Sequence, residues 1–167
     1  LGPRRMAIKD DREHLAAVAR EIKLGESISN EELLQLDCTV LVPAALSEQI
    51  THANASKLRC RILAEGANGP TTLEADRILT DKGVFIIPDI LANSGGVIVS
   101  YFEWVQDVQR FFWKAKDIQD RLQDIITSAF HRTLQFSVEK RTTMRMAALM
   151  SGIDKVAQAH LQRGLYP

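Results

Sequence analysis

The chain has 167 residues, of which 46% are hydrophobic, and this length and composition favour one soluble globular domain. Lys plus Arg and Asp plus Glu both number 21, so nothing in the charge balance favours nucleic acid or an anionic membrane as a partner. The composition favours a small molecule or another protein instead.

No apolar stretch in the sequence approaches the roughly 20 residues that a membrane span needs. The first residues also carry charges where a signal peptide needs an apolar core. We therefore expect no membrane partner and a cytoplasmic location, with the mitochondrial matrix as the alternative.

The two cysteines, Cys38 and Cys60, each lie at the start of an apolar run and form no CxxC pair. Free buried thiols are therefore expected, rather than a disulfide or a metal site. The histidines also lack the spacing of metal ligands, so no metal is predicted.

Residues 1–28 are predicted to form an N-terminal helical segment. Apolar residues recur there at helical spacing, and Gly25 then supplies a stop; the apolar positions are Leu15, Val18, Ala19 and Ile22. Ser29 and Glu32 have the spacing of a capping box, which predicts a short helix over residues 30–36.

Three apolar runs, residues 39–42, 60–64 and 84–87, predict the strands of a parallel sheet. They do not alternate with polar residues, as is typical of strands covered on both faces. A helix is expected between each pair of strands. The first should pass through Gln49, Ile50 and Leu58, and the second should begin at a capping box of Thr71 with Glu74 and end at Gly83. This order predicts an α/β fold with a partial Rossmann-like, doubly wound sheet.

Helical patterns fill the rest of the chain. The first begins at Asn93, the second covers about residues 117–140, and the third ends at Gly164. The last two carry apolar stripes, which we interpret as core contacts because the opposite faces mix acidic and basic residues. The stripe of the last helix contains Met146, Leu149, Met150, Ile153, Ala157 and Leu161.

Ligands of open parallel sheets bind beyond the carboxyl ends of the strands, which here are followed by residues 66–70 and 89–96. Gly95, with Gly96, opens a helix and would let a ligand approach the backbone and the helix N-terminus. Asn93 is either a helix cap or a ligand contact, and residue chemistry alone favours the cap. Asn68 could serve its own turn or bind an amide or ribose hydroxyl. Ser100 is a weak signal by itself.

Several catalytic motifs are absent from the sequence. There is no GxSxG, no P-loop and no GxGxxG fingerprint. A complete dinucleotide site needs a glycine-rich first turn, and this chain lacks one.

Three long stretches, residues 36–46, 64–76 and 88–104, closely resemble the cofactor-binding domain of glutamate dehydrogenases, in the Glu/Leu/Phe/Val dehydrogenase family. The resemblance covers about residues 28–167, whereas residues 1–28 do not follow the family pattern. It implies that residues 29–115 are the C-terminal half of a dinucleotide-binding domain. Residues 116–167 would then be C-terminal helices that return toward a substrate domain absent from this chain.

The resemblance also implies an activity, the reversible NAD(P)-dependent oxidative deamination of L-glutamate to 2-oxoglutarate and ammonia. The cofactor would be NAD or NADP, and intact members would be homohexamers. Residues matching Ala45 and Gln49 lie by the adenosine of the cofactor in this family, and those matching Asn68 and Asn93 lie near its nicotinamide and ribose. Residues matching Val97 and Ser100 reach the substrate side chain.

No catalytic residue can be assigned in this chain, because the lysine and aspartate of the family belong to the missing domain. We therefore expect the chain alone to be inactive. Two other readings stay open: a non-catalytic interaction fragment or truncated paralogue, and another amino-acid dehydrogenase of the same family.

Overall fold

The computed structural model describes residues 28–164, and the predicted helix within residues 1–28 falls almost entirely outside them. The chain divides into two units, Leu1–Leu34 and Gln35–Pro167. The described part of the first unit is helix α2 (Asn30–Leu34), which ends two residues earlier than predicted. Its capping box is confirmed, because Ser29 N donates to Glu32 Oε2 at 2.7 Å and Glu32 N donates to Ser29 Oγ at 3.2 Å.

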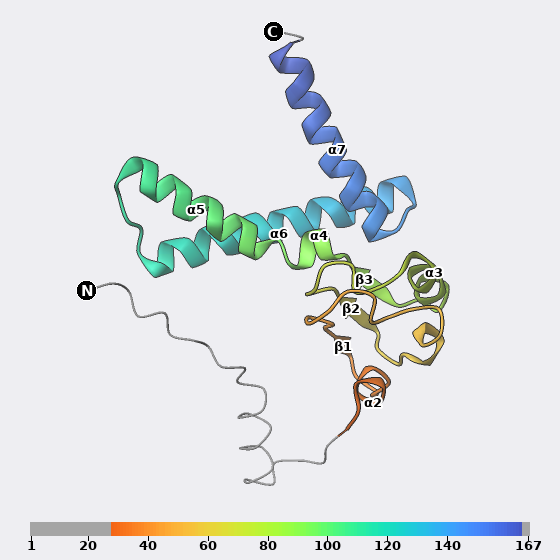
Figure 1. Cartoon of the computed structure of the whole chain (residues 1–167). Helices are drawn as coiled ribbons and strands as arrows, with labels where there is room; N and C mark the ends of the chain where they lie inside the picture. The colour runs from red at the N-terminus through yellow and green to blue at the C-terminus, as the bar shows by residue number, and fades with distance from the viewer. Residues whose placement is uncertain (1–27, 165–167) are drawn as a thin grey trace, which may run out of the picture. The chain divides into compact units, whose positions relative to one another are not determined.

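The second unit contains a three-stranded parallel sheet in the order β1-β2-β3 (Figure 1). Its strands are β1 (Val40–Leu41), β2 (Ile62–Ala64) and β3 (Phe85–Ile87), each within a predicted apolar run. Leu63 pairs with Leu41 on one side and Ile86 on the other. The predicted α/β class, with part of a Rossmann-like parallel sheet, is confirmed.

A compact apolar core packs between the sheet and the segments that connect its strands. Helix α3 (Leu73–Asp81) and the short 3-10 helix η1 (Ala55–Lys57) both contribute to it. The buried members are Ile50, Ala55, Leu58, Cys60, Leu63, Ala75, Leu79 and Ile86. Both cysteines are free thiols; Cys60 is buried and Cys38 is partly buried.

The helix predicted between β1 and β2 is wrong, because only η1 forms there. Ile50 instead makes a parallel bridge with Thr71, and its N–H donates to Pro70 O at 2.9 Å. The carboxamide of Asn54 accepts from Thr51 N at 2.8 Å and donates to Gln49 O at 2.9 Å. These side-chain bonds compete with helical hydrogen bonds, and the bridge holds the backbone extended.

The capping box of Thr71 with Glu74 predicted for α3 is also wrong, because the helix cap lies one residue further along the chain. Thr72 is the N-cap, and its Oγ1 accepts from Ala75 N at 3.3 Å. Thr71 cannot take this place because its backbone is in the bridge with Ile50 and the residue is buried. The helix stops before Gly83, as predicted, where φ of +77° suits glycine.

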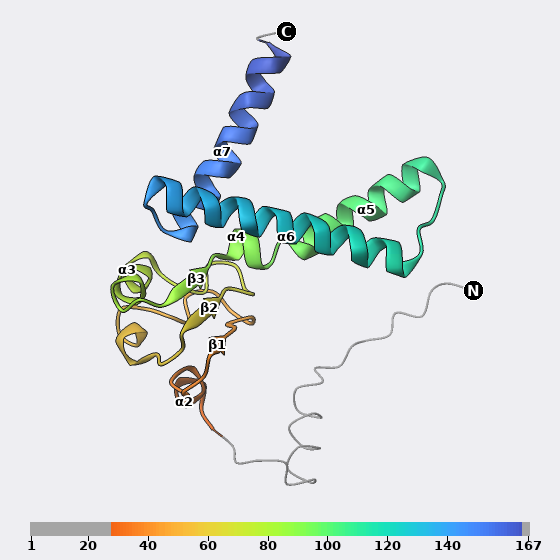
Figure 2. The same ribbon diagram turned by 180° about the vertical axis from the view of Figure 1, so that it is seen from behind.

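The C-terminal part contains four helices, not three. The predicted helix from Asn93 corresponds to α5 (Gly95–Gln109), which begins two residues later. It is preceded by a short helix that was not predicted, α4 (Asp89–Ala92), and followed by α6 (Ala115–Lys140) and α7 (Met144–Arg163). Figures 1 and 2 show α5 alongside α6. The ring of Phe102 on α5 lies 5.5 Å, between centroids, from that of Trp113 in the loop that connects the two helices. No helix in the described part of the chain is long and apolar enough to cross a membrane.

The apolar stripe of α7 departs from the prediction that it makes core contacts. Met144 and Ala147, in the first turn, are buried. Most stripe residues are exposed because α7 leaves the sheet after this turn, and the exposed ones include Met146, Leu149, Met150, Ile153 and Leu161. The stripe of α6 is more covered, since its residues face α5 on one side and the start of α7 on the other.

The core predicts a contrast between two leucines of α3. Leu79 is fully buried and Leu73 is 69% exposed. Leu79→Ala should lower the free energy of unfolding by about 2–5 kcal/mol, because it removes buried methyl groups and leaves a cavity. Leu73→Ala should change it by less than about 0.5 kcal/mol. Urea unfolding followed by circular dichroism measures both, and equal losses would contradict the assigned core.

Burial predicts unequal reactivity of the two thiols. Burial first, and the nearby Cys38 second, raise the pKa of Cys60. The thiolate is the reactive form, so iodoacetamide should label Cys38 before Cys60 in the native chain, and urea should remove the difference. The raised pKa of Cys60 also makes the free energy of unfolding depend on pH. The contribution of the protonated thiol is fully present below the ordinary thiol pKa, and it is lost as the pH rises through the raised pKa of the folded state. Mass spectrometry of the labelled chain gives the order of labelling.

Candidate functional site

An open cleft of about 810 Å³ lies between the loops that follow β1 and β2 and the N-terminus of α5. It brings together five of the residues singled out in the sequence, which come from three separate segments: Ala45, Asn68, Asn93, Val97 and Ser100. The other residues that line it are Leu46, Ser47, Gly66, Ala67 and Gly96.

The loops after β1 and β2 approach each other closely enough to need glycine. A Cβ added to Gly66 would lie 2.9 Å from Ala44 Cβ, and Ala67 N donates to Pro43 O at 2.9 Å. The same turn ends at Gly69, whose φ of +55° is disfavoured for other residues. These two glycines allow the conformation of the turn after β2, which places Gly66, Ala67 and Asn68 at the cleft.

Asn68 and Asn93 meet across the cleft, because Asn93 Nδ2 donates to Asn68 Oδ1 at 2.6 Å. The residue-based interpretation of Asn93 as the cap of the following helix is wrong. Asn93 instead ends α4, and its N–H donates to Asp89 O at 3.0 Å. Within residues 28–164, neither Asn68 Nδ2 nor Asn93 Oδ1 has a hydrogen-bond partner, so this pair offers one donor and one acceptor to a ligand.

The N-terminus of α5 opens on the cleft. The hydroxyl of Ser94 donates to Leu91 O at 2.9 Å, so no side chain caps the first N–H groups of α5. A Cβ on Gly96 would meet nothing within 4 Å, which leaves the backbone open to a ligand. Gly95, predicted to bind cofactor, turns the other way, and a Cβ there would lie 3.6 Å from Ile126 Cδ1 on α6.

The two residues predicted to bind substrate lie one turn apart on α5. Val97 is 76% exposed, and Ser100 is also exposed on the cleft side. Gln49 does not line the cleft; its side chain donates to Ser47 O at 3.0 Å. The side chain of Gln49 therefore supports the loop that carries Ser47, a cleft residue.

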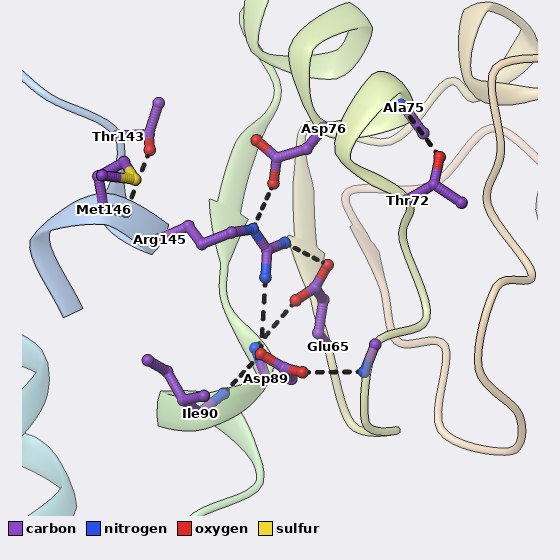
Figure 3. Close-up of polar contacts among 10 residues, drawn as sticks. Glu65, Thr72, Ala75, Asp76, Asp89, Ile90, Thr143, Arg145 and Met146 are labelled. Carbon is purple, nitrogen blue, oxygen red and sulfur yellow. Dashed lines mark hydrogen bonds and ion pairs between the residues drawn. The ribbon is translucent and has the colours of Figure 1, made fainter. Parts of the chain in front are cut away.

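Sequence reasoning missed an ionic cluster around Arg145 (Figure 3). Arg145, in the first turn of α7, donates Nη2 to Glu65 Oε1 and Nε to Asp76 Oδ2, both at 2.6 Å. Its Nη1 lies 3.5 Å from Asp89 Oδ1. Glu65 is fully buried at the end of β2. The three carboxylates thus surround one guanidinium.

This cluster also holds two segments that carry cleft residues, the loop after β2 and the segment after β3 that leads to Asn93. The second oxygen of Glu65 accepts from Asp89 N at 2.9 Å, and Asp89 Oδ2 accepts from Gly69 N at 2.8 Å. Burial lowers the pKa of the Arg145 guanidinium, but its bonds to Glu65 and Asp76 and their negative charge outweigh burial and raise it overall. Arg145 is therefore charged at every accessible pH.

One signal in the sequence points toward the cluster. Glu65 and Asp89 each follow an apolar strand almost directly, where a carboxylate is costly to bury without a partner. The partner itself gives no local signal, because Arg145 lies 80 residues after Glu65.

The cleft suits a ligand with both polar and apolar parts. Two carboxamides and the open N-terminus of α5 provide hydrogen bonds, and the helix N-terminus favours an anionic group. Val97 adds an apolar wall. Among residues 28–164 no group of His, Cys, Asp and Glu could hold a metal ion.

The chain was then compared with known proteins. A family model described as Glutamate/Leucine/Phenylalanine/Valine dehydrogenase matches residues 4–164. A glutamate dehydrogenase of Thermotoga maritima is 50% identical over 143 residues, which are 86% of this chain and 34% of that protein. The NAD-specific glutamate dehydrogenase GudB of Bacillus subtilis is 46% identical over 84% of this chain and 33% of its own length. The chain thus spans about a third of these relatives.

Solved structures agree in fold. The glutamate dehydrogenase of Peptoniphilus asaccharolyticus has a TM-score of 0.73 and 33% identity, covering 92% of this chain and 35% of that one. A hetero-hexameric glutamate dehydrogenase of Thermus thermophilus, in a leucine-bound form, has a TM-score of 0.82 and 27% identity, covering 93% of this chain and 38% of that one. The family match begins at residue 4, upstream of the resemblance that we placed from residue 28.

The ionic cluster predicts a large cost for a small change. Glu65→Gln replaces a buried acceptor oxygen by an N–H₂ group, which would face Arg145 or Asp89 N, both of them donors. The free energy of unfolding should fall by about 3–5 kcal/mol, because the guanidinium loses its buried partner. Asp81→Asn, at the exposed end of α3, should cost less than about 0.5 kcal/mol. Denaturant unfolding measures both free energies, and equal losses in the two variants would contradict a stabilising role of the cluster.

Proposed function

Because the chain belongs to the glutamate/leucine/phenylalanine/valine dehydrogenase family, we propose that it is the C-terminal part of a glutamate dehydrogenase. The proposed reaction is the reversible oxidative deamination of L-glutamate to 2-oxoglutarate and ammonium. We propose NAD rather than NADP as the cofactor, since two relatives, from Bacillus subtilis and Staphylococcus aureus, are named NAD-specific glutamate dehydrogenases.

The convergence of residues on one cleft is the observation that carries this proposal. Ala45, Asn68 and Asn93 were singled out for cofactor, and Val97 and Ser100 for substrate, and all five line the same space. Two ligands that must react with each other need adjacent sites, and α5 supplies both the cofactor end and the substrate end of this wall.

Each proposed role follows from the chemistry of the residue. The Asn68–Asn93 pair would hold the nicotinamide amide and its ribose through the remaining donor and acceptor. The Ser100 hydroxyl would donate to the distal carboxylate of glutamate, and Val97 would contact its methylene groups. Hydride acceptance and return is the chemistry that NAD supplies when bound.

The proposed domain organisation explains why this chain should be inactive alone. Residues 29–115 would form the C-terminal half of the cofactor domain, and residues 116–167 would return toward a substrate domain of the intact protein. Catalysis needs the substrate held against the cofactor, and this positioning contributes about 7–11 kcal/mol. We also propose a cytoplasmic homo-oligomer, a hexamer in the intact protein.

The first test compares the chain with a chimera. The purified chain should not oxidise NADH when 2-oxoglutarate and ammonium are added, because one wall of the site is missing. A chimera in which it replaces the matching third of the Thermotoga maritima relative should be active. Activity of the chain alone, or an inactive but folded chimera, would contradict the proposal.

Ser100 separates glutamate from other amino acids in the same chimera. Ser100→Ala should raise KM for glutamate by about tenfold or more, because a hydrogen bond to a charged group is lost. Ser128→Ala, at an exposed position of α6, is the control and should leave KM unchanged. Better oxidation of leucine or phenylalanine than of glutamate would favour the other amino-acid dehydrogenases of the family.

A further inference from the structure

A short chain of contacts connects the start of α7 to the loop after β2 and to the segment after β3, both of which carry cleft residues. Arg145 bonds Glu65, which in turn accepts from Asp89 N. Asp89 accepts from Gly69 N, next to Asn68, and it also begins the short helix that ends at Asn93. Every step is a hydrogen bond or a covalent link of at most a few residues.

We propose that Arg145 is a positioning residue, which sets the separation of Asn68 and Asn93 and thereby the geometry of the cleft. It touches neither carboxamide and does not line the cleft. Its effect passes through Glu65 and Asp89, which hold the loop after β2 and the segment that leads to Asn93. The inference rests on the proposed function only in taking this cleft as the ligand site.

The shape of the guanidinium is essential to this role. Three separate nitrogens, Nε, Nη1 and Nη2, face Asp76, Asp89 and Glu65 respectively. The planar fork fixes the angles between the three carboxylates, and a lysine ammonium, being a single point charge, cannot do so. Charge and geometry can therefore be separated by substitution.

The cluster divides into two arms with different consequences. Asp76 lies on α3, and within residues 28–164 its carboxylate has no hydrogen bond to the loop after β2 or to the segment after β3. Glu65 and Asp89 lead directly to Gly69 and to the segment before Asn93. Loss of the Asp76 arm should destabilise the fold without moving the cleft, whereas loss of the guanidinium fork should do both.

The test uses the amide signals of the full chain in ¹H–¹⁵N NMR spectra. In Arg145→Lys, the Gly69 N–H and the Asn93 carboxamide should shift, while Trp113 N–H, bonded to Gln106 at the far end of α5, should stay in place. Asp76→Asn is the matched control, because it also removes one ion pair of Arg145. It should lower the melting temperature but leave Gly69 and Asn93 unshifted.

Unchanged Gly69 and Asn93 signals in Arg145→Lys, or equal shifts in Asp76→Asn, would overturn the proposal. If Arg145→Lys does not fold, Asp89→Asn tests the next link, and the same two signals should shift. Titration with NADH is read separately on the same samples. Selective shifts in a chain that fails to bind NADH would support the positioning role and count only against the proposed cofactor site.

Discussion

The buried carboxylate of Glu65, at the end of the central strand, is the constraint to which much of this structure responds. An isolated carboxylate in that place would be very unfavourable, so the fold must bring a cation to it. Arg145 arrives from 80 residues further along the chain. Formation of this pair therefore requires the sheet, α3, α6 and the start of α7 to be in place together. It also leaves the second oxygen of Glu65 to hold the turn before α4.

The cleft is built almost entirely from loops and a helix end. One side depends on the close approach of Gly66 to Ala44, and another side depends on the break between α4 and α5. Much of the remaining surface of the helices is apolar and exposed. Ile90 on α4 and several residues of α7 line a groove of about 620 Å³, namely Ala148, Leu149, Gly152, Ile153, Val156, Ala157 and His160. Uncovered surface of this kind is typical of an interface, and it supports the proposal that these helices turn toward a substrate domain.

The sequence predicted the elements whose signals are local. The strands are short apolar runs, and the helices α3, α5 and α6 follow apolar periodicity closely. Errors arose where a distant partner decided the outcome. Thr71 was mistaken for the cap of α3 because its bridge to Ile50 is invisible in the sequence. The helix expected after β1 gave way to the same bridge and to the hydrogen bonds of Asn54.

In the candidate site too, local signals were predictive and contacts with distant residues were missed. The carboxyl ends of the strands indicated loops that line the cleft, and family resemblance favoured Asn68, Asn93 and Ser100, which line it too. Neither predicted the rotation of α5 that turns Gly96, rather than Gly95, to the cleft. The orientation of α5 about its axis depends on the packing of Gly95 against Ile126. Arg145 was missed because a basic residue in a helical pattern ordinarily reads as surface.

The span of the ionic cluster bears on how such a protein can be inherited or recombined. Glu65, Asp76, Asp89 and Arg145 must come from compatible parents, because each carboxylate is placed for the same guanidinium. A crossover between two diverged genes that falls within residues 65–145 risks separating partners that were selected together. A crossover before residue 35 leaves them all on one side. Where two parents differ at any of these four positions, surviving junctions should therefore be rarer inside this interval than upstream of it.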